Sequence, residues 1–240
     1  MSVSARALVE SLAGHSVAAL GIDPEDVGDS GRWFVAALLL NASRSETAAC
    51  DAARALAREA LGAPHELAAA DAERVAALLS ATKVPKPEVA ARVLLRACGA
   101  LVERWDGSFT ALAGDADDLE TLGGRIAKLA PGVGRAAVTR FLRPLRGAWS
   151  AAAEIPLTPA ALAAGICIGW LPDGVDDDGS ANALRGALAA QDDPPRPSDV
   201  EAALERLGAR ACLRGRADRC PLRDRCPRRA RDVALGGPRE

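Results

Sequence analysis

Tyrosine is absent from this chain, and the other aromatic residues are scarce. Only 3% of the 240 residues are aromatic, whereas 49% are hydrophobic, and much of that share is alanine. Alanine is the best helix former, and the β-branched and aromatic residues that favour strands are few. No segment alternates in the way that a half-buried strand must. The composition therefore predicts an all-α fold, with enough chain for one large domain or two small interlocked ones.

Long apolar runs are also missing. No run approaches the length of about 20 residues that crosses a bilayer as a helix. The first residues, MSVSARALVESL, lack the apolar core of a signal peptide. We therefore expect a cytoplasmic protein without a membrane partner, associated with the nucleoid if its source is bacterial.

Acidic residues are few at the end of the chain, where arginine is concentrated. Ten arginines lie between residues 206 and 231, and only Asp218 and Asp224 oppose them. Ten against two give +8 for this stretch, so the remainder carries −10 in a chain whose net charge is −2. A basic block on an otherwise acidic protein points to a polyanionic partner. The alternative is a solvated arginine-rich tail that binds nothing.

Apolar residues recur at helical spacing along most of the chain. Helices are expected over residues 3–13, 32–42, 46–61, 71–80, 89–104, 115–129, 135–145, 158–170, 180–191 and 198–208. Ser45 is placed to cap the third of these, and Pro144 must end or kink the seventh. The acidic segment LPDGVDDDGS lacks the spacing of a calcium-binding loop, so a solvated connection is expected there.

The segment APGVGR, residues 130–135, joins two of the expected helices. Its two glycines, Gly132 and Gly134, let the backbone bend tightly and approach a ligand. The helix that begins at Arg135 directs free N–H groups and the positive end of its dipole at the turn. A DNA phosphate fits such a site without any base contact. We therefore expect Gly132, Val133, Gly134 and Arg135 to bind DNA; the alternative is an ordinary helix–helix turn with a glycine cap.

Three blocks of sequence are informative both individually and in their order along the chain. They are RWFVAALLLNASRSE from Arg32, KPEVAARVLLRACGALVERWDG from Lys86, and LAPGVGRAAV from Leu129. The first resembles the first barrel helix and DNA-inserting loop of the endonuclease III branch of helix-hairpin-helix DNA glycosylases. The second resembles the helix that ends in that family's "HNG" turn, and the third resembles its LPGVGRKTA hairpin. The resemblance spans roughly residues 30 to 227.

This resemblance implies a two-lobed, endonuclease III-like fold. A helical barrel over residues 25–148 would carry the hairpin. Residues 1–24 with 149–231 would form a second lobe that ends in a cysteine-rich loop, and 232–240 would be a tail. The implied partner is double-stranded DNA that contains a lesion or a mispair, bent in the cleft with one nucleotide flipped out. The protein would act as a monomer.

The family's catalytic positions are altered. Bifunctional members use a lysine just after the hairpin, because only an amine forms the Schiff base that permits strand cleavage. Ala136 stands at that position, so lyase chemistry is not expected. The family's aspartate, eighteen residues on, corresponds to Glu154, whose carboxylate could stabilise the positive charge that develops on the sugar. The alternative is an exposed glutamate before a proline turn.

The family's DNA-inserting glutamine corresponds to Ser43, which is too short to fill the gap left by a flipped base. Asn41 and Arg44 are the nearby substitutes. The resemblance therefore implies a monofunctional DNA N-glycosylase of base excision repair. One alternative is a non-catalytic relative that recognises lesions or DNA structure, and another is a helical interaction protein without affinity for DNA.

Three cysteines, Cys212, Cys220 and Cys226, fall within fifteen residues. Disulfides are not expected in the cytoplasm, so clustered cysteines indicate a metal site. The remaining cysteines, Cys50, Cys98 and Cys167, lie in expected helices and are interpreted as small buried residues.

The cysteine-rich end lies where the family holds a [4Fe–4S] cluster in a C-x6-C-x2-C-x5-C loop. Cys220 and Cys226 keep the spacing of the last two ligands, but the second ligand is absent, and Ala217 stands three residues before Cys220. Three thiolates leave open a cluster with another fourth ligand, a three-iron cluster, or a degenerate loop without metal. In the last case the loop keeps its arginines, among them Arg214 and Arg216, for DNA phosphates.

Overall fold

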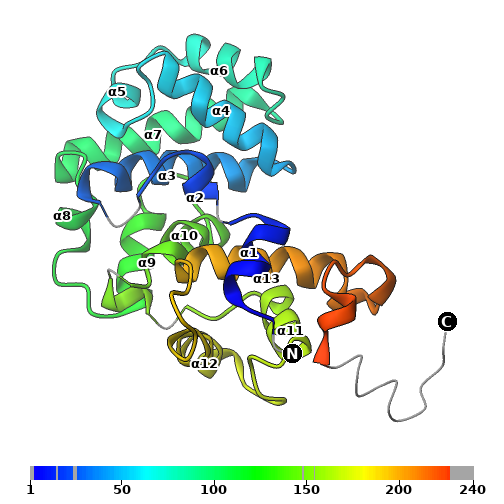
Figure 1. Ribbon diagram of the computed structural model, residues 1–240. Helices are drawn as coiled ribbons and strands as arrows, with labels where there is room; N and C mark the ends of the chain where they lie inside the picture. Colours follow the sequence, from blue (N-terminus) through cyan, green and yellow to red (C-terminus); the bar gives the residue numbers. More distant parts are fainter. Residues whose placement is uncertain (1–2, 15, 24–25, 148, 154, 228–240) are drawn as a thin grey trace. The chain divides into compact units, whose positions relative to one another are not determined.

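The computed structural model describes residues 3–14, 16–23, 26–147, 149–153 and 155–227. Every regular element in these ranges is a helix (Figure 1), so the expected all-α class is confirmed. No helix among them is both long and apolar enough to span a bilayer.

The chain divides into two compact units. The hairpin unit is Ser16–Ala153, and the cysteine unit is Met1–His15 together with Glu154–Glu240. The sequence placed the boundaries at residues 25 and 149 instead. The first boundary falls earlier because α2 (Ser16–Ala19) packs on α4 (Glu46–Arg58), where Arg54 Nη2 donates to the Ala19 carbonyl at 3.0 Å.

The hairpin unit contains the helices from α2 to α10. Besides α2 and α4 they are α3 (Val27–Ala42), α5 (Pro64–Ala68), α6 (Ala72–Ala81), α7 (Pro87–Trp105), α8 (Phe109–Ala113), α9 (Leu119–Ala127) and α10 (Arg135–Leu142), with 3₁₀ turns η1 (Arg143–Leu145) and η2 (Ser150–Ala152). The expected long helices are present, and Ser45 caps α4 as expected. Pro144 falls in η1, just after α10 ends. Three short helices, α2, α5 and α8, were not expected, because four or five residues are too few to show a helical period.

Helix α3 forms the centre of this unit. Residues 33–40 are all buried, as expected for a helix that is apolar all round, and α3 packs against α4, α7, α8 and α10. All three phenylalanines of the chain meet there: Phe34 lies 4.8 Å from Phe109 and 5.2 Å from Phe141 between ring centroids. Trp33 Nε1 donates to the Phe141 carbonyl at 2.8 Å. The scarce aromatic residues thus join α3, α8 and α10.

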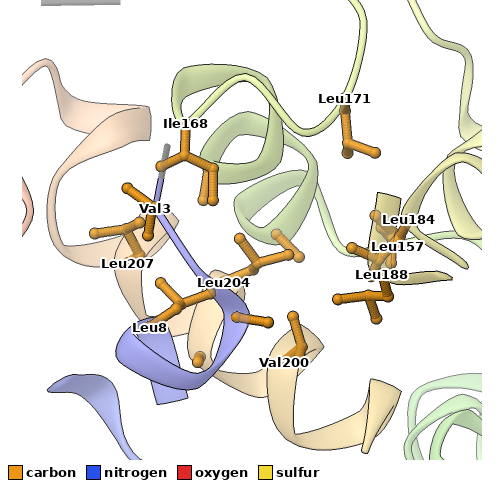
Figure 2. Packing of buried hydrophobic residues seen from close by; sticks show 14 of the residues in the cluster. Val3, Leu8, Leu157, Ile168, Leu171, Leu184, Leu188, Val200, Leu204 and Leu207 are labelled. Atoms are coloured by element: carbon orange, nitrogen blue, oxygen red, sulfur yellow. The ribbon is translucent and has the colours of Figure 1, made fainter. Parts of the chain in front are cut away.

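The cysteine unit has an aliphatic core (Figure 2). Its elements are α1 (Ala5–Leu12), α11 (Pro159–Cys167), α12 (Asp177–Ala189), α13 (Pro197–Arg210) and the 3₁₀ turns η3 (Cys212–Arg214), η4 (Ala217–Arg219) and η5 (Arg223–Arg225). Helices α11 and α13 are in close backbone contact at Gly208. A Cβ at this position would overlap the carbonyl oxygen of Ala160. Asp176 caps α12 by accepting from Gly179 N at 2.7 Å, so part of the acidic segment is a helix start rather than a connection.

The first helix belongs to this unit through polar ties as well as packing. Trp170 Nε1 donates to the Val3 carbonyl at 3.1 Å, and Ala5 N donates to Gln191 Oε1 at 2.7 Å. At the other end of α1, Arg206 Nη1 donates to the carbonyls of Ala13 and Gly14 at 2.8 and 2.7 Å. The same Nη1 also donates to the Leu12 carbonyl at 3.3 Å, which is one of those that the helix end leaves open.

Candidate nucleic-acid interface and cysteine cluster

The turn between α9 and α10 is held in place by a backbone hydrogen bond and by packing against α7. Val133 is only 3% exposed, and its N–H donates to the Ala130 carbonyl at 3.1 Å. Gly132 has φ +105°, and a Cβ there would lie 2.8 Å from Val93 Cγ2 on α7. Both the backbone angle and the close approach require glycine. Gly132 is therefore explained by the fold alone.

Gly134 lies in a different environment. It is exposed, its φ is −87°, and nothing lies within 4 Å of the position that a Cβ would take. It is the N-cap of α10, and it supplies no side-chain hydrogen bond to the helix. The first turn of α10 contains no acidic residue, and Arg135 and Ala136 are exposed. The free N–H groups of this helix end are thus open to an anion.

Every other described helix of eight or more residues begins differently. Seven are capped by a serine, threonine or aspartate side chain, namely Ser4, Asp26, Ser45, Asp71, Asp118, Thr158 and Asp176. The remaining two, α7 and α13, have proline in the first turn. Among these helices α10 alone has neither device, although side-chain caps typically stabilise a helix by about 1 kcal/mol.

Two exposed cations flank the turn along the chain, and a third lies on a helix that contacts it. Arg135 begins α10, and Lys128 caps the C-terminus of α9. Arg96 lies one helical turn beyond Val93, on the side of α7 that packs against the turn. Sequence analysis did not single out Arg96, since only the contact between Val93 and Gly132 shows which side of α7 faces the hairpin.

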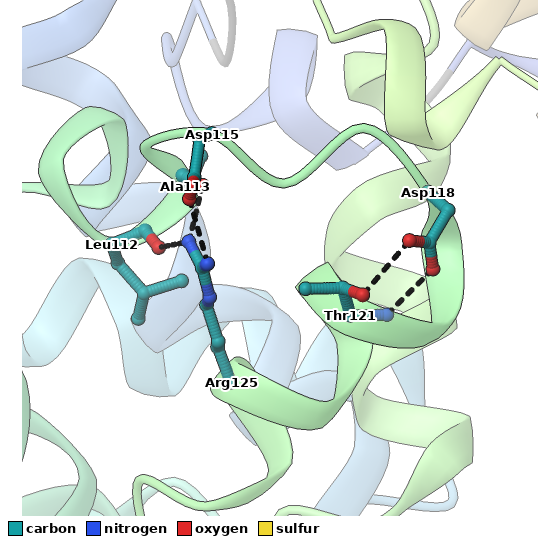
Figure 3. Close-up of polar contacts among 6 residues, drawn as sticks. All are labelled: Leu112, Ala113, Asp115, Asp118, Thr121 and Arg125. Carbon is teal, nitrogen blue, oxygen red and sulfur yellow. Dashed lines mark hydrogen bonds and ion pairs between the residues drawn. The ribbon is translucent and has the colours of Figure 1, made fainter.

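The first helix of the hairpin is held at its start by Asp118 (Figure 3). The carboxylate of Asp118 accepts from Thr121 N and from Thr121 Oγ1, both at 2.8 Å. The hydrogen bond from the backbone N–H of Thr121 is the main reason that the pKa of Asp118 lies below its usual value.

Arg125 ties α9 to α8. Its Nη1 donates to the carbonyls of Leu112 and Ala113 at 3.1 and 2.6 Å, and its Nη2 donates to Asp115 Oδ1 at 2.9 Å. The hydrogen bond from Arg125 is the first cause of the lowered pKa of the Asp115 carboxyl. The Arg125 guanidinium thus caps the C-terminal end of α8 and fixes α9 against it.

The loop between α3 and α4 contains the residues expected to insert into DNA. Ser43 caps α3, and its hydroxyl donates to the Ser45 carbonyl at 2.9 Å and accepts from Ser45 N at 3.2 Å. Its side chain is therefore engaged within its own loop. Asn41 and Arg44 are exposed.

The remaining expected site residues are scattered. Ala136 is exposed in the first turn of α10, whereas Glu154 lies outside the described residues. Arg214 and Arg216 are exposed in the cysteine unit.

The cysteine-rich loop contains a fourth cysteine that sequence analysis assigned to the core. Cys167, the last residue of α11, is only partly buried. The Cys226 thiol donates to the Cys167 carbonyl at 3.4 Å, and the side chains of Cys212 and Cys167 are hydrogen-bonded. The expectation that Cys167 is a small buried residue is therefore wrong. The helical period shows which face of α11 is apolar. It does not show which residues of a distant loop contact the end of the helix.

Two thiols of this cluster, those of Cys212 and Cys220, have raised pKa values. The hydrogen bond with Cys167 raises the pKa of Cys212, and burial and the neighbouring thiols add to this effect. Burial is the main cause of the raised pKa of Cys220. In contrast, Cys50 and Cys98 are buried in the hairpin unit as expected, and burial raises the pKa of Cys98 to about 12.

The cluster supplies donors suited to iron and sulfide, since soft thiolates are the ligands of iron–sulfur clusters. In the parts of the chain that the structure describes, no three His, Cys, Asp or Glu side chains are arranged to hold a single metal ion. A [4Fe–4S] cluster takes one thiolate on each iron, so its four donors surround a larger group than one ion. In number and chemistry, Cys167, Cys212, Cys220 and Cys226 fit such a cluster.

No protein-family model matches the chain. A search of curated proteins gives no match either. We therefore base its function on the hairpin and the cysteine cluster.

Proposed function

We propose that this protein binds damaged duplex DNA and removes a damaged or mispaired base as a monofunctional DNA N-glycosylase. It acts as an endonuclease III-like monomer without Schiff-base lyase activity. The observation that carries the proposal is the start of α10, which alone among the longer described helices has neither a side-chain cap nor a first-turn proline.

A DNA phosphate accounts for Gly134, whereas the fold alone accounts for Gly132. Gly132 is required because Val93 packs against it, and this contact sets the shape of the turn. No such contact explains Gly134, where serine or aspartate would cap the helix better. A side chain at that position would occupy the space that a phosphate needs in order to accept from the helix N–H groups. Lys128 and Arg135 add charge that attracts the DNA backbone.

The chemistry at the flipped nucleotide follows from the two altered positions. Ala136 offers a methyl group where lyases need an amine, so no covalent enzyme–DNA intermediate forms. We assign catalysis to Glu154, whose fixed carboxylate would stabilise the positive sugar in the transition state more than the neutral substrate. An iron–sulfur cluster in the cysteine unit completes the proposal. It would be a structural group near the arginines that bind phosphates, including Arg214 and Arg216.

The binding step is tested by replacing Gly134 with leucine. Because nothing lies within 4 Å of its Cβ position, the fold should tolerate the change. Affinity for duplex DNA should fall about equally for all sequences, and the slope of log affinity against log salt should decrease by roughly one unit for each lost phosphate contact. Gly186→Leu, at an exposed helical glycine of α12 with equally open surroundings, is the matched control. Equal affinity of the two variants would reduce the hairpin to a structural turn.

The catalytic step is tested with a panel of lesion-containing duplexes. Borohydride should trap no covalent complex between the protein and abasic DNA, and Glu154→Gln should abolish base release while binding survives. A trapped complex would show that another lysine serves as nucleophile. Release that persists in Glu154→Gln would move the catalytic acid elsewhere.

A second candidate function is recognition of lesions or DNA structure without catalysis. It is favoured by Ser43, whose hydroxyl is engaged within its own loop rather than extended toward a base stack. Tight binding to lesion DNA, with no base released from any substrate, would select this function.

The arginine-rich end is proposed to add affinity that does not depend on sequence. Replacing Arg214 and Arg216 with glutamine should flatten the salt dependence of binding by up to about two units. An unchanged slope would place these side chains away from the DNA.

A further inference from the structure

Four of the six cysteines gather at one end of the cysteine unit. Cys167 closes α11, and the other three lie in the segment that follows α13. Cys226 Sγ lies 3.4 Å from the Cys167 carbonyl oxygen, and the Cys212 side chain contacts that of Cys167. The thiol of Cys220 lies near those of Cys167 and Cys226, whose charges add to the rise of its pKa that burial mainly causes.

Packing holds this arrangement in place. Cys212 and Cys220 pack against the aliphatic core that includes Ile168, the residue after Cys167. Turn η3 contacts both α11 and α13. Farther along, Pro227 Cγ lies 3.7 Å from the Cβ position of Gly169. The segment from residue 212 to 227 therefore contacts the C-terminal end of α11 at Cys167 and just beyond it at Gly169.

We infer that Cys167 is the fourth thiolate of a metal centre formed with Cys212, Cys220 and Cys226. The site needs a fourth donor, because a [4Fe–4S] cluster takes four thiolates and the segment after α13 supplies three. A helix from another part of the same unit supplies it. Only the identity of the metal group, a [4Fe–4S] cluster, rests on the proposed function. The four-cysteine site itself requires only a metal that prefers thiolate ligands.

The surroundings suit an anionic centre. Metals bind the thiolate form of cysteine, so loading displaces the thiol protons and makes the site more negative than the empty one. Arginines 214, 216, 219, 223 and 225 are all exposed along the same segment. Arg210 lies close enough to Cys220 to favour its charged form. These guanidinium groups would offset the charge of the loaded centre.

The test compares Cys167→Ala with Cys50→Ala, a buried cysteine of the hairpin unit that serves as the matched control. Both variants and the parent are purified without oxygen and reconstituted with ferrous iron and sulfide. The parent and Cys50→Ala should be brown, with about four iron and four sulfide per chain. Cys167→Ala should hold at most about three iron per chain, as expected after loss of one ligand. Equal iron in the two variants would overturn the inference.

Protection of thiols gives a second measurement that needs no variant. In the loaded parent, Cys167 should resist alkylation together with Cys212, Cys220 and Cys226, and all four should become reactive after chelation. Alkylation of Cys167 alone in loaded protein would overturn the inference. So would a metal-free parent after reconstitution, or one in which Cys167 and Cys212 form a disulfide.

Two outcomes separate this inference from the proposed function. Zinc in place of iron, lost in Cys167→Ala, would support the four-thiolate site and overturn the iron–sulfur assignment. Loss of iron in Cys167→Ala, combined with unchanged DNA binding in Gly134→Leu, would support the site and overturn the role of the hairpin.

Discussion

The two units of this chain are stabilised by different kinds of side chain. In the hairpin unit, three phenylalanines and Trp33 fill the space between α3, α8 and α10. In the cysteine unit the core is made of leucine, isoleucine, valine and alanine, and α11 meets α13 through Gly208 and Ala160. Most of the few aromatic residues thus lie in the hairpin unit, whereas close backbone packing stabilises the cysteine unit.

This difference shows where each unit tolerates change. Loss of a large ring leaves a cavity that neighbouring residues fill only in part, whereas loss of a glycine at a helix crossing forces whole helices apart. The proposed functional features lie at the edges of the cores: Gly134 is open to solvent, and the four-cysteine cluster lies at the end of α11, where Cys212 and Cys220 pack against the aliphatic core.

Phe141→Ala should have the largest effect on the hairpin unit. Phe141 is fully buried, and its ring contacts those of Phe34 and Phe109. We expect its loss to lower the free energy of unfolding by about 4 kcal/mol. Leu204→Ala, at an equally buried position of the cysteine unit, should cost about 3 kcal/mol. Urea unfolding followed by hydrogen exchange in each unit measures both, and a larger cost for Leu204→Ala would break the comparison.

Gly208→Ala should destabilise the cysteine unit by about 2 kcal/mol. The added Cβ overlaps the Ala160 carbonyl, so α11 and α13 must separate. Helix propensity alone gives the opposite sign, since alanine is favoured over glycine by about 1 kcal/mol. Gly186→Ala, in open surroundings on α12, should show that gain. Thermal unfolding of the two variants decides the matter, and a stabilised Gly208→Ala would contradict the backbone contact.

Trp170→Phe should cost the cysteine unit about 1 kcal/mol, because it keeps most of the ring but removes the hydrogen bond from Nε1 to the Val3 carbonyl. The amide protons of residues 5–12 should then exchange faster. Trp105→Phe in the hairpin unit is the control and should leave that exchange unchanged. Unaltered exchange in Trp170→Phe would mean that packing alone holds the first helix.

Asp115→Asn should have the smallest effect, and it should depend on pH. The folded-state pKa of Asp115 is lowered, so its contribution to stability is present above the ordinary aspartate pKa and is lost as the pH falls through the lowered value. Parent and variant should therefore differ slightly at neutral pH and converge in strong acid. Urea midpoints across this range measure the effect, with Asp117→Asn as the control for loss of one surface charge. A difference that stays constant in acid would contradict the pairing with Arg125.

Much of the local structure was predictable from the sequence. The all-α class followed from the shortage of aromatic and β-branched residues. The cap at Ser45, the start of a helix at Arg135 and its end before Pro144 all match the structure. These features depend on hydrogen bonds and steric limits between residues a few positions apart, which a sequence displays directly.

Other features were decided by the tertiary structure. The two glycines of the hairpin look alike in the sequence, but only Gly132 is required by a neighbour, because Val93 from α7 packs on it. Cys167 looks like a core residue of α11, yet it meets Cys212 and Cys226 from a segment more than forty positions away. Local periodicity shows which face of a helix is apolar, whereas the partner of that face is chosen by packing among distant segments, whose contacts leave no pattern in either stretch of sequence alone.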